Sequence, residues 1–132
     1  MTKELIINAA FIDVGFEKDA FLHYTDLSPY VKSILKFTNV AINDKIEGGF
    51  DFGKFIVEPE IIKTGKIAEV LSGRPNVLVQ ILKEPIAAKG PRLSCELSLP
   101  GRFVVITPFN DVIAVSRKIH SSDERKRLQK II

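Results

Sequence analysis

The chain has 132 residues, 45% of them hydrophobic, with a formal net charge of +3, a length that supports one compact core. No run of about 18 apolar residues occurs, which excludes a membrane-spanning helix, and the modest charge permits a polyanionic partner without requiring one. Cys95 is the only cysteine, which excludes an internal disulfide and a thiolate metal cage; with no signal peptide at the N-terminus, a cytoplasmic location is expected.

The first third of the chain predicts short strands followed by a helix. Leu5–Asn8 is a strand candidate, and Ala10–Val14 and Phe21–Tyr24 flank a four-residue turn typical of hairpins. The period of two places His23 on the same face as Phe21. Proline is tolerated in the first turn of a helix, so the Ser28-Pro29 pair predicts a helix that begins there.

The middle of the chain, residues 43–66, predicts a long surface excursion without regular structure. Its three phenylalanines are unsuited to full solvent exposure; either they clamp the loop onto the rest of the domain or they contact a partner. They are Phe50, Phe52 and Phe55.

The second half predicts a helical turn at 67–71, then further strands. Residues 77–83 are rich in β-branched side chains, and Arg92–Leu99 alternates apolar and polar positions, which indicates a half-buried strand. Two more strands are expected at 103–107 and 111–115. Ser121 and Glu124 then match a capping box at the start of a basic helix, whose apolar face stops abruptly, so the chain is expected to end inside a larger domain.

Three segments together resemble one protein family. Their sequences are AAFIDVGFEKDAFLHYTDL at 9–27, VLVQILKEPIAAKGPRLSCELSLPGRFVVITPFN at 77–110 and VSRKI at 115–119. They are similar to the amino-terminal part of bacterial ribonuclease E/G endoribonucleases, whose S1 domain is a five-stranded barrel of the oligonucleotide-binding (OB) class. The resemblance implies a mainly β fold with short helices, and single-stranded RNA as the partner with no preference for DNA.

The resemblance also implies which residues contact RNA. The family's two RNA-contacting phenylalanines and lysine match Phe11, Phe21 and Lys89, although either phenylalanine could instead belong to the core. His23 matches a histidine that contacts RNA in many S1 domains, and a structural role is its alternative. Arg92 is expected to assist Lys89, the alternative for both being ordinary surface charge.

The last part of the chain resembles the start of the family's 5′-sensor region. Gly101 matches a glycine whose backbone lines the pocket for a 5′-monophosphate, and Val105 matches an apolar residue that packs against the terminal base; Arg117 is a cation that could assist. The family's catalytic aspartates and their Mg²⁺ belong to a downstream domain, so no catalytic residue, metal ligand or cofactor is expected in this chain. The alternative to RNA binding is a structural or assembly module, with the aromatic residues buried against the rest of the enzyme or a second subunit.

One departure from the family concerns the junction of Asn8 and Ala9, where the family carries about fifty residues that include the first barrel strand. The expected domains are a strand remnant at 1–8, an S1 domain at 9–99 and a 5′-sensor-like region from 100 to 132. A barrel without its first strand exposes two strand edges. Three explanations remain open: a segment missing from the sequence, strand exchange within a homo-oligomer, or a degenerate or trimmed fragment.

Overall fold

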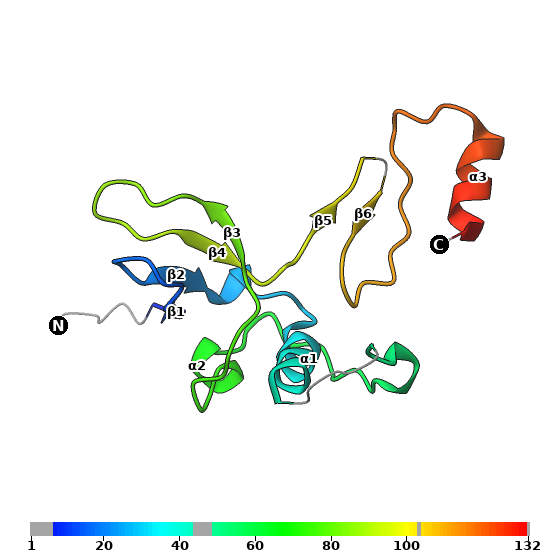
Figure 1. Ribbon diagram of the computed structural model, residues 1–132. Helices are drawn as coiled ribbons and strands as arrows, with labels where there is room; N and C mark the ends of the chain where they lie inside the picture. Colours follow the sequence, from blue (N-terminus) through cyan, green and yellow to red (C-terminus); the bar gives the residue numbers. More distant parts are fainter. Residues whose placement is uncertain (1–6, 44–48, 103, 132) are drawn as a thin grey trace. The chain divides into compact units, whose positions relative to one another are not determined.

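A computed structural model of the chain describes residues 7–43, 49–102 and 104–131. The chain divides into two compact units, Met1–Leu97 and Ser98–Ile132, which are described separately below. In chain order the elements are β1 (Ala9–Ile12), β2 (Ala20–His23), the 3-10 helix η1 (Tyr24–Asp26), α1 (Val31–Asn43), the 3-10 helix η2 (Phe52–Lys54), α2 (Ile67–Val70), β3 (Gln80–Lys83), β4 (Arg92–Ser94), β5 (Leu99–Pro100), β6 (Val105–Ile106) and α3 (Ser122–Ile131) (Figure 1).

The first unit is built on a four-stranded sheet with the order β1-β2-β4-β3. Strands β1 and β2 form an antiparallel hairpin in which Phe11 faces Phe21, and β3 and β4 form a second antiparallel hairpin. The two hairpins join through a parallel contact between β2 and β4, where the Phe21 N–H donates to the Pro91 carbonyl at 3.1 Å. Within the described part of the chain, β1 and β3 are edge strands, so the sheet is open rather than closed into a barrel.

The core of this unit lies on one face of the sheet. The alternation of β2 turns Ala20 and Leu22 inward, and these residues pack with Leu93 of β4 and with Val31 and Ile67 from the helices. Burial of these apolar side chains is the main stabilising contribution. The opposite face of β2 carries Phe21 and His23, which are not part of this core.

Local signals account for the elements that were predicted well. Asp13 accepts the N–H of Gly15 at 2.9 Å, and Gly15 has φ 82°, a left-handed conformation that glycine adopts without strain; this sets the β1–β2 turn. Ser28 accepts the N–H of Tyr30 at 3.1 Å just before α1 begins. The predicted hairpin and the helix after Ser28 are confirmed, and the helical turn predicted at 67–71 is found at Ile67–Val70.

The predicted strand Leu5–Asn8 falls partly on residues 1–6, outside the described residues, and Ile7 and Asn8 are not in a strand. Asn8 instead fastens the start of β1 to the segment before α2. Its side-chain amide donates to the Gly65 carbonyl and its side-chain oxygen accepts the N–H of Ile67, at 2.9 and 2.8 Å.

Several strand predictions were wrong in extent. The strand expected at 77–83 begins only at Gln80, and the one expected over Arg92–Leu99 ends at Ser94, where the Ser94 hydroxyl accepts the N–H of Glu96 and turns the chain. Residues 111–115 have no strand; β6 pairs with β5 instead. The three phenylalanines of the middle segment do pack, but not against the sheet: Phe50 and Phe52 contact Phe37 of α1, and Phe55 contacts Phe50.

Among the described residues, no helix combines the length and apolar character needed to cross a membrane.

Candidate nucleic-acid interface

Three aromatic rings lie in a row on the solvent face of the β1–β2 hairpin; we call them the aromatic row (Phe11, Phe21 and His23). Phe11 and Phe21 are cross-strand partners with ring centroids 6.0 Å apart and planes at 67°, and His23 lies 6.4 Å from Phe21 along β2. Phe11 is 72% exposed. The alternation of β2 keeps the row out of the core, so the predicted placement of His23 beside Phe21 is confirmed.

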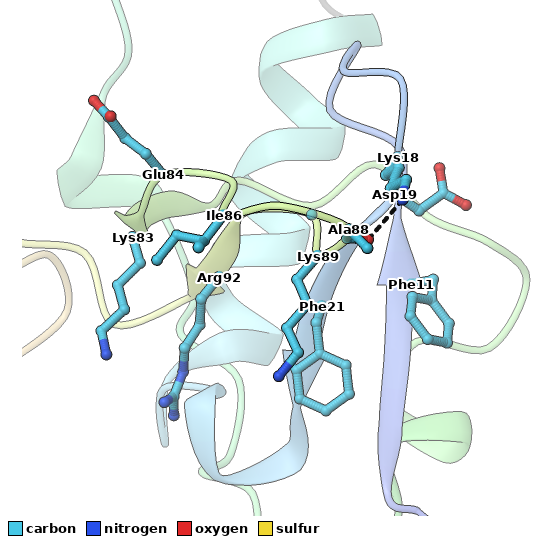
Figure 2. Close-up of a pocket in the computed structure, with 11 residues that line it drawn as sticks. Phe11, Lys18, Asp19, Phe21, Lys83, Glu84, Ile86, Ala88, Lys89 and Arg92 are labelled. Atoms are coloured by element: carbon cyan, nitrogen blue, oxygen red, sulfur yellow. Dashed lines mark hydrogen bonds between the residues drawn. The ribbon is translucent and has the colours of Figure 1, made fainter.

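The row borders a cavity of about 780 Å³ between the two hairpins. Its other lining residues are Lys18, Asp19, Lys83, Glu84, Ile86, Ala88, Lys89, Gly90 and Arg92. Figure 2 shows the side chains of Lys83, Lys89 and Arg92 extending in the same direction as the ring of Phe21, whereas the carboxylates of Asp19 and Glu84 point away from them. Positive charge is therefore gathered beside the rings and negative charge is turned outward.

Hydrogen bonds within one loop and between two loops hold the segment that carries Lys89. Lys89 is the last residue of a tight turn, in which its N–H donates to the Ile86 carbonyl at 3.0 Å. Ala87, inside the turn, adopts φ 51°. Across the cavity, the Lys18 amine donates to the Ala88 carbonyl at 2.8 Å, the dashed contact in Figure 2. The loop that carries Lys89 is thus held against the β1–β2 turn.

His23 and Arg92 are held by the residues that follow β2. The Thr25 N–H donates to Nδ1 of His23 at 3.2 Å; since this nitrogen accepts, the neutral ring carries its proton on Nε2. Arg92 forms an ion pair with Asp26, with the guanidinium nitrogen 3.2 Å from Oδ1. The structure therefore brings Phe11, Phe21, Lys89 and Arg92 to one cavity, and His23 to the adjacent ring position.

Two cations of this cavity were missed from the sequence. No binding role was expected from the sequence for Lys18 or for Lys83. The structure pairs Lys83 with Arg92 across β3 and β4. Residues 83 and 92 flank the loop 84–91, so hairpin symmetry was the signal that could have placed the lysine beside the arginine. Lys18 is placed at the cavity by its hydrogen bond to Ala88, which lies 70 positions further along the chain, and no local sequence pattern indicates this contact.

The 5′-sensor-like residues all belong to the second unit. Gly101 and Val105 lie in the β5–β6 hairpin, where the Gly101 N–H donates to the Val104 carbonyl at 2.6 Å and Val105 pairs with Pro100. Arg117 lies exposed in a turn before α3. The Gly101 N–H is thus already bonded inside its own hairpin.

No group of three potential metal ligands occurs among the described His, Cys, Asp and Glu residues. Cys95 is fully buried, and burial, with a smaller effect of the Asp26 charge, raises the pKa of its thiol to about 12. A thiol held protonated in this way is unsuited to nucleophilic attack.

Comparison with known proteins identifies the relatives of the chain. The ribonuclease E/G family pattern matches residues 98–132. The chain is 31% identical to ribonuclease G of Escherichia coli strain K12 over 126 residues, which are 96% of this chain and 22% of that protein. It is 36% identical over 124 residues, 93% of this chain, to ribonuclease E of Synechocystis sp. PCC 6803 and to a ribonuclease E/G-like protein of Porphyra purpurea, covering 14% and 19% of those proteins.

The chain thus spans about a fifth or less of the length of these relatives, while they match nearly all of it. Both the family pattern in the second unit and the longer matches across both units lead to the same family. The chain belongs to the ribonuclease E/G family.

Proposed function

We propose that residues 9–99 form an S1-type module of the OB class that binds single-stranded RNA, as part of a ribonuclease E/G-like endoribonuclease of RNA processing and decay in the cytoplasm. The observation that carries this proposal is the aromatic row with three cations extending beside it. Single-stranded nucleic acids are bound by this combination of stacking rings and a positively charged track.

Each component of the face has a distinct role in this proposal. Phe11 and Phe21 stack on bases, each contact contributing roughly 1–3 kcal/mol, and their inclined planes hold two bases at different angles. His23 donates from Nε2 to a base or phosphate. Lys89 and Arg92 meet phosphates, Arg92 through the planar fork that matches phosphate oxygens. Stacking on ring faces is tolerant of sequence, so this face favours single strands of any composition.

We further propose a role for the second unit and a location for the RNA-cleaving residues. Residues 100–132 begin a 5′-sensor-like region to which Gly101, Val105 and Arg117 contribute. Cleavage, with the Mg²⁺ that the family uses, belongs to parts of a ribonuclease E/G protein outside this chain. The role of this chain is to hold RNA, without a cofactor of its own.

A structural or assembly role is the rival function, and one observation favours it. Strand β1 is an edge of the sheet, and edge strands present unpaired backbone groups that can take up another strand, as in a homo-oligomer formed by strand exchange. In that case the apolar surface of β1, with Phe11, would be covered by protein. The cations that line the cavity beside Phe11 favour the RNA function.

The test is a titration of a fluorescein-labelled single-stranded oligoribonucleotide, followed by anisotropy at several salt concentrations. We expect log K to fall linearly with log salt, with a slope of about −0.7 for each phosphate contact. The double variant Phe11→Ala/Phe21→Ala is expected to lose at least about tenfold in affinity. The variant Lys89→Ala is expected to bind more weakly and to reduce the slope by about one contact.

Matched controls are provided by Phe16→Ala and Lys32→Ala, which remove an exposed ring and an exposed cation outside the cavity. Both should bind like the parent chain. Binding that survives in the folded Phe11→Ala/Phe21→Ala variant would contradict the proposed face. A folded protein that binds no RNA at low salt but forms concentration-dependent oligomers would favour the assembly role.

A further inference from the structure

Asp26 connects the two strands that carry the cationic and aromatic groups of the proposed face. It is the last residue of η1, and only 10% of its side chain is exposed. Its Oδ2 accepts the N–H of His23 at 3.1 Å, and its Oδ1 accepts from the Arg92 guanidinium at 3.2 Å. Its carbonyl accepts the N–H of Cys95 at 2.9 Å, just after β4.

A largely buried carboxylate beside an RNA-binding face requires an explanation, because its negative charge opposes the approach of phosphates. The ion pair with Arg92 offsets that charge and also restricts an otherwise flexible side chain. The guanidinium has five N–H donors, and the contact to Oδ1 uses one nitrogen of the fork, so further donors remain for a phosphate. An arginine held in place beforehand loses less conformational entropy on binding.

We propose that Asp26 is a positioning residue for RNA binding: its carboxylate holds Arg92 beside Phe21 and fixes the backbone at His23, so that both groups face the ligand before it arrives. This proposal rests on the RNA-binding function proposed above. Phe21 and Arg92 are register partners between β2 and β4, so a restraint on the guanidinium acts directly beside the central ring of the aromatic row.

The sign of one substitution separates positioning from bulk charge. Asp26→Asn removes a negative charge near the face, and long-range electrostatics alone would therefore strengthen RNA binding. If Asp26 positions Arg92, the same substitution weakens binding, because the neutral amide no longer holds the guanidinium. The two explanations predict opposite changes in the dissociation constant.

The experiment measures oligoribonucleotide affinity by anisotropy for Asp26→Asn, Arg92→Ala and the double variant. We expect Asp26→Asn to weaken binding by roughly three- to tenfold, and to cause no further loss when Arg92 is already alanine. Glu17→Gln is the matched control: it removes one carboxylate from the nearby exposed turn, outside the cavity, and should leave affinity unchanged or up to about twofold tighter. Circular dichroism and thermal melting establish that each variant is folded.

Asp26→Asn that binds as tightly as the Glu17→Gln control, or an equal loss in the presence and absence of Arg92, would overturn the positioning role. If Asp26→Asn fails to fold, Asp26→Glu takes its place, because it keeps the charge but displaces the carboxylate. Weaker RNA binding by Asp26→Glu supports the positioning role, and unchanged binding contradicts it. Failure of the RNA-binding function itself is recognised separately, since Phe11→Ala/Phe21→Ala and Lys89→Ala would then also leave affinity unchanged.

Discussion

Gly90 lies directly against the backbone of Asp19, and a Cβ atom at position 90 would stand 2.2 Å from the Asp19 carbonyl oxygen. This contact joins the loop between β3 and β4 to the turn between β1 and β2, at the point where Lys18 also donates to the Ala88 carbonyl. Lys89 precedes Gly90, so the approach of these two backbones sets the position from which the Lys89 side chain extends. The glycine is needed here for space.

We therefore expect Gly90→Ala to be destabilising, by roughly 1–3 kcal/mol, because a methyl group cannot be accommodated without moving one of the two loops. RNA affinity should fall with it, since the displaced loop carries Lys89. Chemical denaturation and RNA titration measure the two effects. Gly53→Ala is the control: its Cβ would lie 3.1 Å from a flexible Asp51 side-chain oxygen, and it should cost much less. Equal stability of the two variants would contradict this account.

The second prediction compares Phe11 with Leu22, residues on opposite faces of the same hairpin. Phe11 is 72% exposed, so Phe11→Ala should change the free energy of unfolding by less than about 1 kcal/mol while weakening RNA binding. Leu22 is fully buried, and Leu22→Ala should cost about 2–5 kcal/mol. Urea denaturation of both variants measures the difference. A large loss of stability in Phe11→Ala would indicate that Phe11 packs against protein, as the assembly function requires.

Part of this site follows from local sequence. The hairpin that holds Phe11 and Phe21 was predictable because alternation, Gly15 and a short turn all specify it within a few neighbouring positions. The family resemblance added Lys89, which composition alone would not have distinguished from surface charge, and Arg92 was expected only to assist it.

The remainder depends on contacts between distant segments. Alternation predicted that Ser94 faces solvent, but Leu93, Ser94 and Cys95 are all buried, because the chain turns after Ser94 and the Cys95 N–H bonds to the Asp26 carbonyl. Lys18 and Asp26 gain their roles only when β2 meets the β3–β4 hairpin. An alternation of period two carries no information on contacts between distant strands, so the contacts of these residues could be identified only from the structure.

The third prediction concerns pH and Cys95. Burial raises the pKa of this thiol from the ordinary 9.0 to about 12, so above pH 9 the native state retains a proton that the unfolded chain releases. The contribution of Cys95 to stability is therefore complete below about pH 9 and declines as the pH rises toward 12, by up to about 1.4 kcal/mol per pH unit.

Denaturation at a series of pH values tests this, with Cys95→Ala as the reference. Lysines and tyrosines also titrate in this range, so the difference between the two proteins is the informative quantity. The parent chain should lose stability relative to Cys95→Ala between pH 9 and 12. Parallel curves would show that the thiol ionises freely in the folded protein.

The last prediction concerns the segment after α1, which four phenylalanines hold against the helix. Phe37 of α1 lies 5.2 Å from Phe50 and 5.9 Å from Phe52, measured between ring centroids. Polar contacts reinforce the attachment: Lys36 pairs with Glu58 at 3.1 Å, and the Ser33 hydroxyl accepts the N–H of Glu58 at 2.8 Å. None of these residues lines the cavity beside the aromatic row.

We expect Phe37→Ala to loosen residues 49–58 without weakening RNA binding, because the ring contributes to this attachment and not to the proposed face. Hydrogen exchange followed by mass spectrometry should show faster exchange in peptides from that segment, while the β1–β2 hairpin stays protected. Ile42→Ala, which truncates an exposed side chain on the same helix, should leave the exchange unchanged. A loss of RNA affinity in folded Phe37→Ala would place this aromatic cluster within the binding surface, since attachment of the segment alone gives no reason for affinity to change.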